Sequence, residues 1–304
     1  MSPDRARNRH PDRSALARSS TAVLAAGLLL IPGLGACSAP EGPARSAPAA
    51  ASASRPDPRA SAAPLLTDVL NRINERGSVR STVRGDLGFV GDLDGAGVAR
   101  YNPDGSDVSL RGHTRPNPQQ RPQPLELAVL DGVGYLKSPL LRPDPAKPWL
   151  RIAPDGTDFA AKLLAPALRQ LQDSTDPRAT FRGIEHATKI QSSAPDQVDG
   201  QPATHYSLRV LTGPAAASAP DEQQRKRLQR AADSGQPEIG YELWIGPDGL
   251  PLRFAAAQKV AQAGQVSLDS TYRDWGTAAD VQAPRPEQVG QFPNGPLPQA
   301  QPPR

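Results

Sequence analysis

Tyr241-Glu-Leu-Trp-Ile-Gly-Pro-Asp-Gly-Leu-Pro-Leu-Arg253 is the stretch that decides the fold of this chain. Two strand-like runs, 241–245 and 250–254, flank the pair Asp248-Gly249. Asp-Gly supplies the positive backbone angles that tight two-residue turns require. The stretch therefore predicts a β-hairpin.

The same signal recurs along the chain, at Asp94-Gly95, Asp104-Gly105, Asp131-Gly132, Asp155-Gly156 and Asp199-Gly200. Strand-like runs flank several of these pairs, and residues 204–210 and 266–272 alternate with period two. Repeated hairpins predict a mostly antiparallel sheet with one buried face. The run 92–95 also faintly resembles a calcium loop, but it lacks the further oxygen ligands, so a turn is expected there.

Three segments have helical character. Residues 64–76 carry apolar side chains at helical spacing, and Gly77 ends the pattern. Residues 159–171 place three leucines on one face, but Pro166 is expected to kink or divide this helix. Residues 221–232 have acids first and bases last, with Leu228 as the sole large apolar residue, which favours either a solvated helix or a floppy insertion.

Residues 1–36 have the parts of a secretory leader. Five arginines precede an apolar run of about 14 residues, which is shorter than the roughly 20 that a membrane-spanning helix needs. Leu34-Gly-Ala-Cys37 then resembles the lipobox of bacterial lipoproteins. The resemblance implies that Cys37 is the site of lipid attachment, with diacylglyceryl and palmitate chains, and that the mature chain starts there. The alternative is a free thiol.

The remaining composition bounds the domain organisation. The chain has 304 residues, and removing the 36 of the leader leaves 268, with 30 basic and 29 acidic side chains. This balance gives no support for nucleic-acid binding. Residues 37–63 read as a disordered Ala/Ser/Pro tether, 64–284 as one folded domain, and 285–304 as a disordered Pro/Gln-rich tail. Aromatic residues make up only 4% of the chain, so the core is either thin or built around a cavity.

The sequence shows no recognised catalytic or metal-binding motif. His113, His186 and His205 have no metal-ligand spacing, and no nucleophile elbow or nucleotide fingerprint is present. We expect no metal, no cofactor and no enzymatic activity, with a hydrolase as the third alternative. The basic run 225–230 is expected to be a solvated helix face, and Trp149, Trp244 and Trp275 are expected to pack on strands.

Several phrases in order resemble the actinobacterial LppX/LprA/LprF/LprG lipoproteins, which are similar to LolA and LolB. These phrases are 131–137 with 148–151, 198–206, 241–253, 272–276 and 281–284. The resemblance covers residues 64–284, although the 213–237 insertion departs from it. It implies an α+β fold, in which a strongly curved antiparallel half-barrel carries helices on its concave face. It also implies an apolar cavity between sheet and helices.

The resemblance leads to two readings of function. In the first, the chain is anchored by its acyl chains to the extracytoplasmic face of the cell membrane and binds or transfers lipids or glycolipids, with an export transporter as a candidate partner. Leu164, Leu168 and Leu171 would then line the cavity; alternatively, they fill a closed core. In the second reading, the chain is a non-enzymatic envelope module with a closed core that acts through a protein partner.

Overall fold

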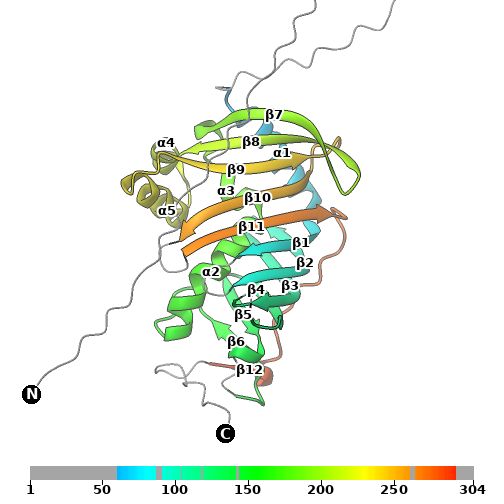
Figure 1. Ribbon diagram of the computed structural model, residues 1–304, viewed down its shortest axis with the longest axis vertical. Helices are drawn as coiled ribbons and strands as arrows, with labels where there is room; N and C mark the ends of the chain where they lie inside the picture. Colours follow the sequence, from blue (N-terminus) through cyan, green and yellow to red (C-terminus); the bar gives the residue numbers. More distant parts are fainter. Residues whose placement is uncertain are drawn as a thin grey trace, which may run out of the picture. The chain divides into compact units, whose positions relative to one another are not determined.

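The computed structural model describes residues 60–86, 91–103, 105–117, 119–141, 144–260 and 264–291 (Figure 1). Cys37, the expected leader and residues 37–59 of the expected tether lie outside the described residues. The architecture below therefore concerns the expected folded domain and its immediate flanks.

One sheet of twelve strands dominates the part of the chain that the structure describes, in the order β12-β6-β5-β4-β3-β2-β1-β11-β10-β9-β8-β7. Neighbouring strands are antiparallel, except for the parallel pair β12 and β6. The sheet is open and curved, and helices cover its concave face (Figure 1). This confirms the expected α+β class. The strands are β1 (Ser78–Asp86), β2 (Asp92–Asn102), β3 (Gly105–Arg115), β4 (Gln123–Leu130), β5 (Val133–Lys137), β6 (Trp149–Ile152), β7 (Thr188–Val198), β8 (Gln201–Leu211), β9 (Glu238–Ile245), β10 (Pro251–Val260), β11 (Gly264–Arg273) and β12 (Val289–Gly290).

The Asp-Gly pairs do not all behave alike. Asp131 and Gly132 have φ values of 48° and 75° and join β4 to β5. Asp199 and Gly200, at 50° and 78°, join β7 to β8 in the same way. At the β9–β10 connection only Gly249 has positive φ, and the loop is wider than a two-residue turn.

The turn expected at 92–95 is wrong, because these residues lie inside strand β2. Gly95 pairs with Val83 of β1 on one side and with Gly112 of β3 on the other. Backbone pairing along two neighbouring strands outweighs the local turn preference of Asp-Gly at this position.

Helix α1 (Ala63–Arg76) agrees with the expected range. Its buried face consists of Leu66, Val69, Leu70 and Ile73, at the spacing that places side chains on one side of a helix. Gly77, with φ of 70°, ends the helix by donating its N–H to the carbonyl of Ile73.

Helix α2 (Phe159–Thr175) begins at Asp158, whose side chain accepts a hydrogen bond from the Ala161 N–H at 2.9 Å. It continues through Pro166, so the proline does not divide the helix. A short helix, α3 (Pro177–Phe181), follows at once, and Asp176 caps it by accepting from the Arg178 N–H.

The 213–237 insertion folds as two helices, α4 (Thr212–Ser218) and α5 (Glu222–Asp233). Asp221 caps α5 by accepting from the Gln224 N–H at 2.7 Å. Leu228 is only 1% exposed, and Gln224 is buried as well. Helix α5 therefore packs one face on the protein, and it is neither a solvated helix nor a floppy insertion.

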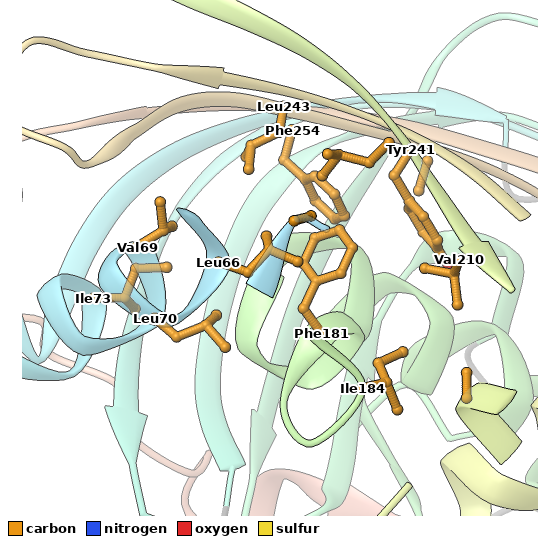
Figure 2. Close-up of a cluster of buried hydrophobic side chains, with 14 of the residues drawn as sticks. Leu66, Val69, Leu70, Ile73, Phe181, Ile184, Val210, Tyr241, Leu243 and Phe254 are labelled. Carbon is orange, nitrogen blue, oxygen red and sulfur yellow. The ribbon is translucent and has the colours of Figure 1, made fainter. Parts of the chain in front are cut away.

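Two apolar cores lie between the helices and the concave face of the sheet. In the first core, α1, α3, α4 and α5 contact strands β8 to β11 and the adjoining ends of β1 to β3. Phe181 of α3 lies at its centre, edge-on to Tyr241 and Phe254 (Figure 2). In the second core, α2 covers β1 to β6 and β11. Small buried residues such as Ser81 and Ser270 separate the two cores on β1 and β11.

Both flanks of the domain attach to sheet edges. At the start, the Ala62 N–H donates to Thr188 and the Ile190 N–H donates to Ala60, which joins the chain to β7. At the end, residues 286–290 fall in the expected tail but form a 3-10 turn and strand β12, where Val289 faces Trp149 of β6. Two further 3-10 turns are Pro139–Leu141 and Glu185–Ala187.

Candidate functional site

The three leucines predicted to line a cavity lie on the inner face of α2. Leu164 is 4% exposed and Leu171 is 2% exposed, and both belong to the second core. Leu168 is partly buried and packs against the same cluster. The three side chains thus share the face of α2 that meets the sheet, as their helical spacing predicts. Whether they line a cavity or fill a core depends on the space around them.

A small pocket of about 70 Å³ opens beside Leu168. Gly134 of β5 lines it and allows Leu168 to approach closely, because a Cβ at this position would collide with Cδ1 of Leu168. Ligand pockets for small molecules commonly have volumes of about 300–1,000 Å³. Helix α2 is thus closed on the sheet in this conformation. The pocket is lined by Val129, Gly132, Gly134, Ile152, Pro154, Ala165, Leu168, Arg169 and Gln172.

Polar contacts fix the C-terminal half of α2 in place. Gln172 donates from Nε2 to the carbonyl of Ser106, which ties the helix to the start of β3. Tyr272 of β11 donates its hydroxyl to the carbonyl of Thr175 at 3.3 Å. Burial raises the pKa of this tyrosine well above its usual value. These bonds fix the helix end where the two cores meet.

Asp173 faces helix α5 rather than the sheet. Its Oδ2 lies 2.7 Å from Nη1 of Arg227, and each side chain is 22% exposed. Burial raises the pKa of Asp173, and the nearby charge of Arg227 opposes that rise only in part. One turn earlier, Arg169 donates to the amide oxygen of Gln223. Sequence reasoning missed this connection.

Arg178 holds α3 against the rest of the domain. Its guanidinium lies 4.4 Å from the ring centroid of Tyr101 and pairs with the buried carboxylate of Asp176. The remaining donors reach Asn74 of α1 and the carbonyls of Asn102 and Gly105. Because every N–H of the guanidinium has an acceptor, Arg178 has no donor left for a ligand, and its role is structural.

The convex face carries an aromatic ladder across strands β8 to β10. His205 stacks on Trp244 with the ring centroids 4.1 Å apart, and Arg253 lies over the other side of the indole at 4.3 Å. Nε2 of His205 is 2.8 Å from Glu242, and Trp244 donates to Asp196. These side chains satisfy one another, which agrees with a packing role for Trp244.

The other aromatic and basic candidates are dispersed. Trp275 stacks on Tyr101, and Trp149 lies in β6. In the basic run, Lys226 pairs with Glu222 on the exposed side of α5, as a solvated face predicts. Arg227 instead turns inward, so the expectation of a solvated face is wrong for that residue.

Across the described ranges, no group of histidine, cysteine and acidic side chains is placed to hold a metal ion. No helix among these residues combines the length and the apolar character needed to cross a bilayer.

A second pocket of about 210 Å³ lies at the end of α1, and it is mainly polar. It is lined by Arg72, Glu75, Arg76, Asp248 and Leu250.

Comparisons with known proteins give a match at the level of structure. No family model and no curated protein matches this sequence. The solved structure of LprF from Mycobacterium bovis matches this chain. It does so with 18% identity and a TM-score of 0.42, over 74% of this chain and 99% of that one. LprF is among the lipoproteins that the sequence resembles.

The complex of MucA and MucB from Pseudomonas aeruginosa is also similar, with 15% identity and a TM-score of 0.32. That similarity covers 73% of this chain and 59% of the matched chain. At these levels of identity, the similarities concern the fold alone.

Proposed function

We propose that this chain is an envelope lipoprotein that binds the acyl chains of a lipid or glycolipid between α2 and the sheet. Acylated Cys37 would anchor it to the extracytoplasmic face of the cell membrane after removal of residues 1–36. Of the expected 37–63 tether, residues 37–59 would link the anchor to the domain, because Ala60 and Ala62 already bond to β7. The binding domain would extend beyond residue 284 to include strand β12, which falls in the expected 285–304 tail. Binding and transfer need no catalytic residue, cofactor or metal.

The observation that carries the proposal is the apolar interface under α2. The helix presents Leu164, Leu168 and Leu171 to a sheet surface made of leucine, valine and isoleucine from β1 to β6 and β11. Exposure of an acyl chain to water costs about 0.8 kcal/mol per methylene, so sheltering a dozen methylenes saves roughly 10 kcal/mol. A continuous apolar surface between helix and sheet can supply that shelter once α2 moves outward.

Helix α2 has to move because the present space is too small. A pocket of about 70 Å³ holds only a few methylene groups, whereas the proposal requires room for a chain. The pocket lies beside Leu168, the least buried of the three leucines, and marks the place where the interface is already partly open.

The closed packing itself favours a second candidate function. Leu164 and Leu171 are buried as deeply as ordinary core residues. If α2 never leaves the sheet, the domain is a non-enzymatic envelope module that acts through a protein partner, such as a transporter or a sensor.

Native mass spectrometry separates the two candidates. The Cys37→Ser chain, which lacks the proposed acylation site, is incubated with phospholipid vesicles and then separated from them. The carrier hypothesis predicts a bound lipid adduct that is reduced by Leu168→Trp, because the indole fills the pocket. Leu65→Trp, at a partly buried leucine of α1 outside this interface, is the matched control. A folded chain without an adduct would favour the module.

The anchor is tested separately by metabolic labelling with an alkynyl fatty acid. Cys37 is the sole cysteine of the chain, so the label should be lost completely in Cys37→Ser. Label that persists in this variant would contradict attachment at Cys37.

A further inference from the structure

The segment between β8 and β9 leaves the sheet and returns to it at one place. Leu211, the last residue of β8, pairs with Glu238, the first of β9. Immediately beyond this pair, the Thr212 N–H donates to Pro237 at 2.9 Å and its hydroxyl donates to Gln236 at 2.8 Å. Helices α4 and α5 therefore form an excursion from a closed hairpin, and they can shift without breaking any strand pairing.

One face of α5 binds the two helices that follow one another beneath it. Gln223 accepts from Arg169 of α2, and Arg227 pairs with Asp173 one turn further along the same helix. Between them, Gln224 donates to the carbonyl of Thr180 in α3 at 3.0 Å. The C-terminal half of α2 thus lies between the sheet on one side and α5 on the other.

Apolar contacts hold the excursion only weakly. Leu228 is the one large apolar side chain that α5 buries, and α4 buries only alanines with Thr212. The Arg227–Asp173 pair is also imperfect, because Nε of Arg227 is buried without an acceptor among the described residues. A buried donor without a partner reduces the net stabilisation that the pair provides. This attachment is specific in geometry but small in apolar area, as expected of an element that opens.

We propose that the α4–α5 excursion is a latch that holds the C-terminal half of α2 against the sheet through Arg227–Asp173 and Gln223–Arg169, and that its release admits acyl chains. The inference rests on the proposed function for its consequence, because it concerns the opening of the same interface. The physical coupling of α5 to α2 does not depend on any ligand and is tested without one.

Hydrogen–deuterium exchange of the full chain without added lipid tests the coupling. In Arg227→Met, amide exchange in residues 165–175 of α2 is expected to rise about tenfold, because the closed state loses the ion pair that opposes opening. Lys226→Met is the matched control, since Lys226 is the neighbouring residue and pairs with exposed Glu222. It should leave α2 unchanged. Faster exchange in α5 with unchanged α2 would overturn the latch.

Two more variants separate the loss of the latch from the effect of an unpaired charge. Asp173→Asn with Arg227→Met removes both charges, so a rise in α2 exchange cannot then come from an unpaired buried carboxylate. If only the single variant shows the rise, the latch is contradicted. Gln223→Ala removes an exposed contact and should leave the fold intact, as circular dichroism can verify, while it accelerates α2 exchange by about two- to threefold.

Uptake of a fluorescent phospholipid from vesicles then separates the latch from the proposed function. Faster uptake in Arg227→Met than in Lys226→Met is the result expected if both hold. If α2 exchanges faster in Arg227→Met but no variant takes up phospholipid, the latch is supported and lipid binding is refuted. Equal uptake in all variants would support lipid binding and overturn the role of the latch.

Discussion

Arg178 and Asp176 form an ion pair that is almost entirely buried, with Nη2 2.9 Å from Oδ2 and 3% and 2% of the two side chains exposed. Taking two charges out of water is costly, and the additional hydrogen bonds of the guanidinium offset that cost. The pair fixes α3 beside α1 and beside the β2–β3 connection, where Asn102 and Gly105 accept from Arg178.

Replacing Arg178 should therefore destabilise the fold strongly. Arg178→Met leaves the carboxylate of Asp176 buried without its partner, which is expected to lower the free energy of unfolding by about 3–5 kcal/mol. Arg182→Met, which removes a donor to the carbonyl of Pro103, is the control and should cost less than about 1 kcal/mol. Urea unfolding followed by tryptophan fluorescence measures both. Equal losses would refute the special role of Arg178.

Asp107 should give the domain an acid-sensitive component of stability. Burial raises the pKa of this carboxyl, but bonds from Arg100, Asn102 and the Asp131 N–H outweigh burial and hold its pKa below the usual value. A carboxyl whose pKa is lowered by folding stabilises the folded state fully at pH values above its unfolded-state pKa of about 3.9. This stabilisation is lost as the pH falls through the folded-state pKa.

Asp107→Asn tests that component. The variant should be less stable than the parent by about 1–3 kcal/mol at pH 7, and the difference should shrink as the pH falls below about 5. Asp94→Asn removes an exposed partner of Arg84 and should follow the parent at each pH. The measurement is the free energy of unfolding in urea from pH 7 to pH 3. A constant difference between Asp107→Asn and the parent would contradict the assignment.

The close approach of β2 and β3 should depend on Gly97. A Cβ at this position would overlap the carbonyl oxygen of Ser109, which belongs to the neighbouring backbone and cannot rotate away. Gly97→Ala is expected to cost about 1–3 kcal/mol, as overpacking does in a well-packed core. Gly105→Ala meets open space and should change stability by less than about 0.5 kcal/mol. Thermal unfolding compares the two variants. An unchanged midpoint temperature in Gly97→Ala would disprove the close contact.

Two further glycines should respond to alanine with opposite signs. Gly200 has φ of 78° in the β7–β8 turn, so Gly200→Ala should destabilise by about 1–2 kcal/mol. Gly213 lies in α4 with open space around its Cα, so Gly213→Ala should stabilise by up to about 1 kcal/mol. The shifts of the unfolding midpoint provide the test. If both shifts had the same sign, backbone conformation would not be the cause.

Local patterns predicted much of the fold. The spacing of Leu66, Val69, Leu70 and Ile73 predicted α1, and alternation along 204–210 predicted β8, because burial on one face leaves a period in the sequence. The pair Asp94-Gly95 gave a wrong prediction of a turn, because a turn preference is local, whereas β2 is stabilised by pairing with two neighbouring strands. Polar and proline-containing β7 gave no comparable signal.

The polar connections were beyond sequence reasoning for a physical reason. Arg178 and Asn74 are 104 positions apart, and Arg227 and Asp173 are 54 apart. A single sequence does not show which charged side chains meet after folding. The spacing of the leucines of α2 predicted that they share one helix face, but their degree of burial depends on how closely the helix approaches the sheet.

The attachment of Ala60 and Ala62 to β7 has a mechanical consequence. Tension on the preceding chain reaches two backbone hydrogen bonds to this edge strand before it reaches α1. Such a load would peel the first residues of β7 rather than stretch the centre of the sheet. The β7 edge is thus where a pull on the preceding chain would first act.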